Sequence, residues 1–564
     1  MNERASGILL HPTSLFNRFP IGDLGPAATA FVDFLVKGGQ RWWQMLPIGP
    51  TGWSDSPYQS TSAFAGNPLL LSPDRLMEKG FLDRLDIQFS PLSDLGMVDY
   101  AAAIKLKLGL LKKAFECFKK NTNRPGRQEF DSFVDVEQDW LEDFSLFSAI
   151  REKERTSDWT RWGQEIRTRR PEALVRVKKD LADDILYHKF VQWQFSTQWN
   201  ELRSYCISKG LALIGDIPLF VAFQSADVWA HPGLFKLGED GSPAVVAGVP
   251  PDYFSKTGQV WGVPVYNWVE LQKQNYGWWI ERLRTAFGRF DLNRLDHFIG
   301  FVRTYEVPAH AKTAEEGRYQ LGGGAFFLKS AREVFGPLPL IAEDLGIITT
   351  EVAALRDQFK LPGTRVLQFE LEPNLNNDSF RVEQHPENSV VYTGTHDNDT
   401  TAGWYRMLPV SQRETLRKRL AVNEKDVVWG MIHEAFASNA KTAIIPMQDI
   451  LELGSEARMN YPGTAEGNWG WRLKEGELTP ELAQRILNLT EVTGRLVGWV
   501  SRLAKRPSDD DRTTGIAKSA QELYERHGCG KGQGNEDWFG AEREMNKRGA
   551  AMTPSPSLPK DPHK

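Results

Sequence analysis

Eight short apolar runs with β-strand character recur along the chain, and helical patterns separate most of them. They lie at residues 7–11, 41–47, 211–216, a run ending at 296, 338–343, 364–369, 389–396 and 443–449. Strands that alternate with helices are typical of parallel β/α units, and eight units close a barrel. We therefore predict an α/β fold: a (β/α)8 TIM barrel with helical and loop insertions between strands, plus a short C-terminal helical appendage.

The 564 residues are too many for one small core, and the pattern indicates several regions. We expect a catalytic barrel domain over residues 1–505, which contains a largely helical insertion at about 75–200 and a loop-rich lid at about 224–267. A charged linker at 506–515 precedes a small helical domain at 516–548. The proline- and serine-rich tail at 549–564 has the composition of a disordered segment.

Composition excludes several classes of function. The net charge of −5 gives no basic field for nucleic acid or anionic membrane, so neither is expected as a partner. No run approaches the roughly 20 apolar residues of a membrane helix, and the N-terminus lacks the apolar run of a signal peptide. The three cysteines, Cys117, Cys206 and Cys529, form no CxxC or paired pattern. We therefore expect a cytoplasmic protein without a structural zinc site.

Polar side chains gather where the predicted strands end: His11, Asp216, Arg294, Asp296, His297, Glu343, His396, Asp397 and Asn398. In TIM barrels the active site lies at this end of the strands. Carboxylates on three different strands, with an arginine and histidines among them, indicate glycosidic chemistry, which needs a nucleophile and a general acid/base. No metal cluster competes, and the glycines at 322–324 follow no strand and lack a P-loop lysine.

Arg294 and Asp296 point the same way, because side chains alternate along a strand. An adjacent guanidinium keeps a carboxylate ionised and oriented, as a nucleophile requires. An ordinary ion pair at the end of a strand is the alternative. Asp344, next to Glu343, would face the other way and support the following turn. His11 has two open interpretations, a structural histidine or a sugar contact.

Nine sequence blocks, in order, closely resemble the 4-α-glucanotransferases called amylomaltase or disproportionating enzyme. They are SPYQ at 56–59, SAFAGNP at 62–68, GDIPLFVA at 215–222, AGVPPDYF at 247–254, RLDHF at 294–298, AEDLG at 342–346, LPG at 361–363, GTHDNDT at 394–400 and GSEARMNYPG at 454–463. The resemblance spans roughly residues 5–503. It implies a member of the α-amylase clan that needs no cofactor and moves part of an α-1,4-glucan to the 4-hydroxyl of a glucose or maltooligosaccharide acceptor.

The resemblance also assigns roles. Asp296 matches the family nucleophile, Glu343 the general acid/base, and Asp397 the carboxylate that holds the sugar's 2- and 3-hydroxyls. The residues that correspond to substrate-binding positions are Tyr58, Asp216, Arg294, His297, His396 and Asn398. Among them, Arg294 matches the arginine that orients the nucleophile, and Tyr58 resembles the tyrosine that stacks on the donor glucose. Glu343 must be protonated near neutral pH, so a dry setting or a nearby anion should raise its pKa.

The segment 248–262 resembles the family's mobile lid and carries Tyr253, Phe254 and Trp261. These rings would stack on the acceptor and exclude water from the covalent intermediate. Alternatively, they only pack the segment onto the barrel. Two positions depart from the family pattern, Gln224 for an acidic residue and Val263 for asparagine, and both put acceptor contacts in doubt.

Two other functions remain open at this stage. An α-glucan hydrolase would share every catalytic residue and differ only in its access to water. A catalytically dead glucan-binding scaffold would lack one of the three carboxylates, yet all three are present. The piece at 516–548 resembles a small bacterial domain of unknown function, for which we expect a docking role.

Overall fold

The computed structural model describes residues 3–88, 96–120, 126–251, 255–375 and 381–498. Its centre is a closed barrel of eight parallel strands in the order β1-β12-β11-β10-β9-β6-β3-β2. The barrel strands are β1 (Ala5–Leu9), β2 (Trp42–Gln44), β3 (Ala212–Ile217), β6 (Leu292–Leu295), β9 (Leu340–Ala342), β10 (Gly363–Val366), β11 (Ser389–Tyr392) and β12 (Thr442–Pro446). The predicted (β/α)8 barrel is confirmed.

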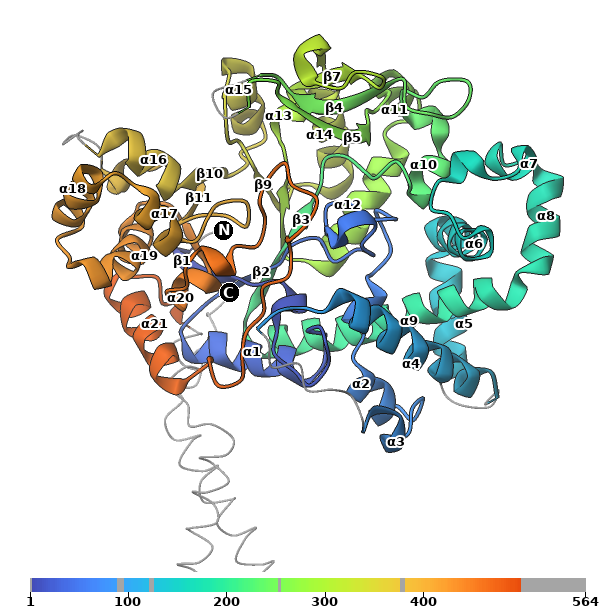
Figure 1. The fold of residues 1–564 in the computed structure, drawn as a ribbon, viewed down its shortest axis with the longest axis horizontal. Helices are drawn as coiled ribbons and strands as arrows, with labels where there is room; N and C mark the ends of the chain where they lie inside the picture. The colour runs from blue at the N-terminus through green and yellow to red at the C-terminus, as the bar shows by residue number, and fades with distance from the viewer. Residues whose placement is uncertain (1–2, 89–95, 121–125, 252–254, 376–380, 499–564) are drawn as a thin grey trace, which may run out of the picture. The chain divides into compact units, whose positions relative to one another are not determined.

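Helices surround the barrel and fill the long excursion between β2 and β3 (Figure 1). The excursion holds α2 (Pro73–Glu78), α3 (Arg84–Ile87), α4 (Tyr100–Lys120), α5 (Gly126–Val136), α6 (Gln138–Glu154), α7 (Gln164–Arg167), α8 (Pro171–Asp180) and α9 (Ala182–Lys209). The helical pattern expected over 172–198 is two helices, because the chain leaves the α conformation at Leu181, which ends α8 and begins α9.

The remaining helices lie between the strands or after the last of them. They are α1 (Pro26–Lys37), α10 (Ala226–Ala230), α11 (Trp268–Lys273), α12 (Gly277–Arg289), α13 (Ile299–Val302), α14 (Gly324–Phe335), α15 (Thr350–Gln358), α16 (Leu367–Asn374), α17 (Thr401–Met407), α18 (Val410–Leu420), α19 (Val427–Ala437), α20 (Met447–Ile450) and α21 (Pro480–Val492). The predicted strand at 443–449 is too long. It ends at Pro446, whose extended backbone begins α20. The predicted strands at 364–369 and 389–396 also end early, at Val366 and Tyr392.

The stretch 224–267, expected to be rich in loops, also contains regular elements that the sequence had not predicted. It contains β4 (Val245–Val249) and β5 (Gln259–Pro264), which join β7 (Arg303–Pro308) and β8 (Arg318–Leu321) in an antiparallel sheet of order β5-β4-β7-β8. Figure 1 shows this sheet above the barrel, on the other side from α2 and α3. The segment that carries Trp261 is therefore a strand of a small sheet.

Register in the barrel places the first pair of site residues. Asp216 on β3 lies directly beside Arg294 on β6, and Arg294 lies beside Ile341 on β9. Side chains at paired positions of neighbouring parallel strands point to the same face. The buried side chains of Asp216 and Arg294 consequently meet at the ends of their strands.

Candidate active site

An ion-pair row joins β3 to β6 at the mouth of the barrel. Nη1 of Arg294 lies 2.8 and 3.0 Å from the two carboxylate oxygens of Asp216, and 3.0 Å from Oδ1 of Asp296. The Tyr58 hydroxyl donates to Oδ2 of Asp216 at 2.8 Å. One guanidinium nitrogen therefore serves two carboxylates, and of the two only Asp296 has appreciable side-chain exposure, at 26% against 0% for Asp216.

The charges of this row depend on one another. Burial opposes the charge on Arg294, but Asp216 and Asp296 raise its pKa well above the ordinary value. Burial raises the pKa of Asp216 to about 7, against the opposing effect of Arg294, and the Asp296 charge adds to the rise. The arrangement holds a permanent positive charge against Asp296, which fixes the orientation of its carboxyl group.

Glu343 follows β9 and accepts a hydrogen bond from the residue after Asp296. The backbone N–H of His297 donates to Oε2 of Glu343 at 2.7 Å. Burial raises the pKa of Glu343 to about 8; Arg294 and the His297 N–H oppose the rise, whereas Asp296 and Asp397 add to it. At neutral pH Glu343 is thus a protonated acid near a pKa suited to giving and taking a proton.

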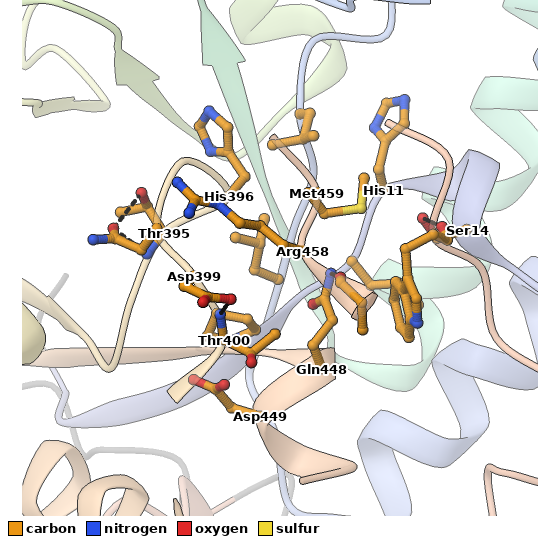
Figure 2. Close-up of a pocket in the computed structure, with 17 residues that line it drawn as sticks. His11, Ser14, Thr395, His396, Asp399, Thr400, Gln448, Asp449, Arg458 and Met459 are labelled. Carbon is orange, nitrogen blue, oxygen red and sulfur yellow. Dashed lines mark hydrogen bonds between the residues drawn. The ribbon is translucent and has the colours of Figure 1, made fainter. Parts of the chain in front are cut away.

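Asp397 lies in the turn after β11 and is held from a different segment. The Asn460 side-chain amide donates to its Oδ1 at 2.6 Å, and Arg458 donates to its backbone carbonyl at 2.6 Å. Figure 2 shows Arg458 extending toward the turn that carries Thr395 and His396. With a side chain 45% exposed, Asp397 keeps free carboxylate surface for hydroxyl groups.

Aromatic rings line both sides of these carboxylates. The Tyr58 ring stacks on His396, with centroids 5.1 Å apart and planes at 14°. Trp261 meets His297 edge to face at 4.8 Å. Burial lowers the pKa of both His297 and His396, so each imidazole is neutral at neutral pH and has a hydrogen bond to offer a hydroxyl.

The structure thus brings together most of the predicted site residues. Among them, Asn398 is the least available to bind a sugar hydroxyl. Its side-chain oxygen already accepts hydrogen bonds from the N–H and the hydroxyl of Thr395, and these bonds close the turn that contains both residues. Tyr253 and Phe254 lie outside the described residues. Asp344 faces away from the site and accepts from the Thr364 N–H at 2.7 Å and from Arg356 at 2.6 Å, a support for the neighbouring β10 and α15.

His11 borders a small cavity beside the site, of about 30 Å³, which also touches His396 (Figure 2). Burial and the nearby His396 lower the pKa of His11 to about 3. Its Nδ1 has no hydrogen-bond partner among the described residues. The cavity is large enough for one water molecule, which would satisfy that nitrogen.

Three residues outside the predicted set also shape the site. Asn460 holds Asp397, and Trp469 packs beside Tyr58 and His396. Asp449 accepts from Thr393 and Thr401, at 2.5 to 2.7 Å, and so clamps both ends of the turn that carries Asp397. Asn460 lies in the sequence block at 454–463, one of the nine blocks described above. Its place in that block was the signal that could have identified it as a site residue.

Neither a metal centre nor a membrane-spanning helix is found among the described residues. No group of three or more His, Cys, Asp or Glu side chains there is placed to hold a metal ion. Among the same residues, no helix combines the length and apolarity that crossing a bilayer requires.

Comparison with known proteins decides the family. A family profile described as 4-alpha-glucanotransferase matches residues 10–479. The chain belongs to the 4-α-glucanotransferase family. The 4-alpha-glucanotransferase of Thermus thermophilus is 46% identical over 501 residues, covering 87% of this chain and 99% of that protein. The 4-alpha-glucanotransferase of a Synechocystis species is 45% identical, covering 88% and 99%.

A solved structure extends the similarity to three dimensions. The amylomaltase from Streptococcus agalactiae in complex with acarbose superposes with a TM-score of 0.84 at 36% identity, covering 87% of this chain and all of that one. Residues 511–546 weakly match a profile described as a protein of unknown function, DUF2934. The family assignment concerns the barrel, and the C-terminal match adds no chemistry.

Proposed function

We propose that this member of the 4-α-glucanotransferase family transfers a segment of an α-1,4-glucan to the 4-hydroxyl of an acceptor, which is glucose or a maltooligosaccharide, without a cofactor. The observation that carries the proposal is the pair of carboxyl groups in different surroundings: Asp296 beside the permanent charge of Arg294, and the buried Glu343 with a pKa raised to about 8. Such a pair supplies the nucleophile and the acid of a retaining glycosidic reaction.

In the first step Asp296 attacks the anomeric carbon, and the bond from that carbon to the glycosidic oxygen breaks. Glu343 gives its proton to the departing oxygen, and a covalent glycosyl-enzyme forms on Asp296. In the second step the acceptor 4-hydroxyl attacks the same carbon and gives its proton to Glu343. The bond to Asp296 then breaks, and two inversions leave the α configuration retained.

The surrounding residues bind and orient sugar. Asp397 accepts hydrogen bonds from the 2- and 3-hydroxyls of the reacting ring, while His297, His396 and Asn398 bind hydroxyls around it. The orienting set is Asp216, Arg294 and Tyr58, with the Tyr58 ring against the donor glucose. These contacts strengthen as the ring flattens in the transition state.

Water must be kept from the glycosyl-enzyme for transfer to prevail over hydrolysis. Trp261 on β5 lies against His297, one residue from the nucleophile, and supports a shield in which Tyr253 and Phe254 complete the acceptor side. Hydrolysis is not favoured as the main activity, because the relatives with the same barrel are named as transferases.

Two further proposals concern the whole chain. We keep the division into a catalytic domain at 1–505, a linker at 506–515, a small docking domain at 516–548 and a tail at 549–564; the last three lie outside the described residues. We also propose a cytoplasmic location, on the grounds of the small number of cysteines, their lack of a CxxC pattern in the sequence, and the glucan substrate.

Incubation with maltotriose tests the function. The expected result is a ladder of longer maltooligosaccharides plus glucose, with the total concentration of reducing ends unchanged. Reducing ends that rise in step with maltotriose consumption would identify a hydrolase instead. The Asp296→Ala variant is the control, since it should bind glucan and form no ladder.

A further inference from the structure

Trp469 adopts a strained backbone conformation beside the proposed donor site. Its φ angle is +63°, in the left-handed region, and its side chain is buried, with 5% of the residue exposed. Its N–H donates to the Met459 carbonyl at 2.7 Å, and its own carbonyl accepts from the Tyr100 hydroxyl at 3.1 Å. A left-handed conformation at a residue other than glycine is strained and persists only where its surroundings require it.

The Trp469 ring packs against two proposed sugar ligands. Its centroid lies 5.8 Å from that of Tyr58, with the planes at 40°, and 6.0 Å from that of His396, with the planes at 37°. Tyr58 and His396 stack on each other at 5.1 Å. The three rings therefore form one cluster, and Trp469 limits how far the other two can tilt or shift.

The cluster continues to the proposed nucleophile through polar contacts. The Tyr58 hydroxyl donates to Asp216 at 2.8 Å, Arg294 bonds Asp216 at 2.8 Å, and the same guanidinium nitrogen lies 3.0 Å from Asp296. Each of these contacts joins buried or half-buried groups, for which a displacement of one partner moves or unpairs the next. An unbroken series of ring contacts, hydrogen bonds and ion pairs therefore links the Trp469 ring to Asp296.

We propose that Trp469 is a positioning residue for glucan transfer: its ring fixes Tyr58 and His396, and through the Tyr58 hydroxyl it keeps Asp216 and Arg294 aligned with Asp296. The inference rests on the proposed function and assigns Trp469 no contact with the reacting atoms. A positioning role predicts a loss in kcat, because misplacement of a reacting group by about 1 Å costs about a hundredfold in rate.

Two substitutions distinguish the effect of the Trp469 ring from the effect of its backbone conformation. Trp469→Gly adopts the left-handed conformation without strain and removes the ring. We expect kcat for maltotriose to fall about 30- to 100-fold, with KM within about threefold. Trp469→Phe keeps an aromatic ring and should restore kcat to within about tenfold of the wild type. Trp429→Phe, at a similarly buried tryptophan on α19, controls for general loss of core packing.

A double-mutant cycle tests the route through Tyr58. Tyr58→Phe keeps that ring and removes the hydroxyl bond to Asp216. If Trp469 acts through that bond, adding Trp469→Gly to Tyr58→Phe should lower kcat by less than about threefold further. Unfolding midpoints, measured for every variant, ensure that only folded protein is compared.

The outcomes are distinct. A wild-type kcat in folded Trp469→Gly would overturn the positioning role. So would a double variant whose loss in kcat equals the product of the losses in the two single variants. A variant that changes KM alone would mean that Trp469 acts in ground-state binding and would also overturn it. If Trp469→Gly fails to fold, the same decision rests on Trp469→Asn, which also removes the ring and tolerates the left-handed region, alone and with Tyr58→Phe. Failure of the wild type to form the maltotriose ladder would instead refute the proposed function.

Discussion

The backbone N–H of His297 donates to the carboxylate of Glu343 at 2.7 Å, although His297 itself is held at a φ of +50°. That N–H belongs to the peptide unit that joins Asp296 to His297, and the left-handed conformation turns the chain directly after it. Strain of this kind at a functional site persists where the surroundings require a fixed geometry. The proposed nucleophile and acid are therefore coupled through one peptide unit.

His297→Gly and His297→Ala should differ in stability and agree in activity. Glycine adopts a positive φ without cost, so the glycine variant should be about 1 kcal/mol more stable than the alanine variant. Both lack the imidazole, and kcat/KM for maltotriose should fall about tenfold in each through the loss of one sugar hydrogen bond. Urea unfolding and initial rates provide the two measurements. A glycine variant less stable than the alanine variant would contradict the role of strain.

Glu343→Gln should stabilise the protein in a pH-dependent way. The pKa of Glu343 is about 8 in the native protein and 4.5 as the ordinary value, so the folded state binds more protons between those values. Stability falls as pH rises wherever the native state holds the extra proton. Removing the group should raise the free energy of unfolding by several kcal/mol at pH 8, about 4 from the two pKa values, and leave it nearly unchanged at pH 4.

Urea unfolding at both pH values makes that comparison, with Glu475→Gln at an exposed position as the control. An equal change at pH 4 and pH 8 would mean that Glu343 is not a protonated acid in the native protein.

Asn460→Asp should impair transfer by placing a second carboxylate against Asp397. The present amide donates at 2.6 Å to Oδ1, so the new oxygen would repel it or take up a proton. We expect kcat to fall about tenfold or more at pH 8, with partial recovery at pH 5, where one of the two acids is protonated. Asn460→Ala, which removes the donor without adding charge, should lose activity without that recovery. An Asp variant with wild-type rates would show that Asn460 does not hold Asp397.

Trp261→Ala should change the fate of the glycosyl-enzyme more than its formation. The ring covers His297 beside the proposed nucleophile, and its removal admits water to that side. The ratio of hydrolysis to transfer, measured as new reducing ends per maltotriose consumed, should rise several-fold. Val260→Ala, at an exposed neighbour on β5, should leave the ratio unchanged. An unchanged ratio in Trp261→Ala would remove this residue from the shield.

Periodicity predicted the barrel because most of its strands lie in buried, largely apolar runs that polar residues follow, as in the segment from Ala212 to Asp216. The antiparallel sheet was not predicted. Its strands β4 and β5 lie in a stretch rich in glycine, proline and aromatic residues, and β8 is short and mostly exposed. The sheet is joined in the middle by the pairing of β4 with β7, which lie far apart in the chain, and local pattern carries no information on such a contact.

The candidate carboxylates could be found because each follows its own strand, and strand ends converge in a barrel. The residues that hold these carboxylates in place could not be found in the same way. Asn460 and Trp469 sit in a segment without regular structure, and they reach Asp397 and Tyr58 through packing that no spacing rule describes. Arg294 illustrates the same limit: the sequence predicted its pairing with Asp296, whereas its two bonds to Asp216 follow from barrel register.

Trapping of the glycosyl-enzyme tests the central claim most directly. The Glu343→Gln variant, given α-maltotriosyl fluoride, should release fluoride without needing an acid and then stall, because no base activates the acceptor. Peptide mass spectrometry should find the maltotriosyl group on Asp296. Fluoride release with the sugar on another residue, or with no covalent adduct, would contradict the assignment of Asp296 as the nucleophile of a double displacement.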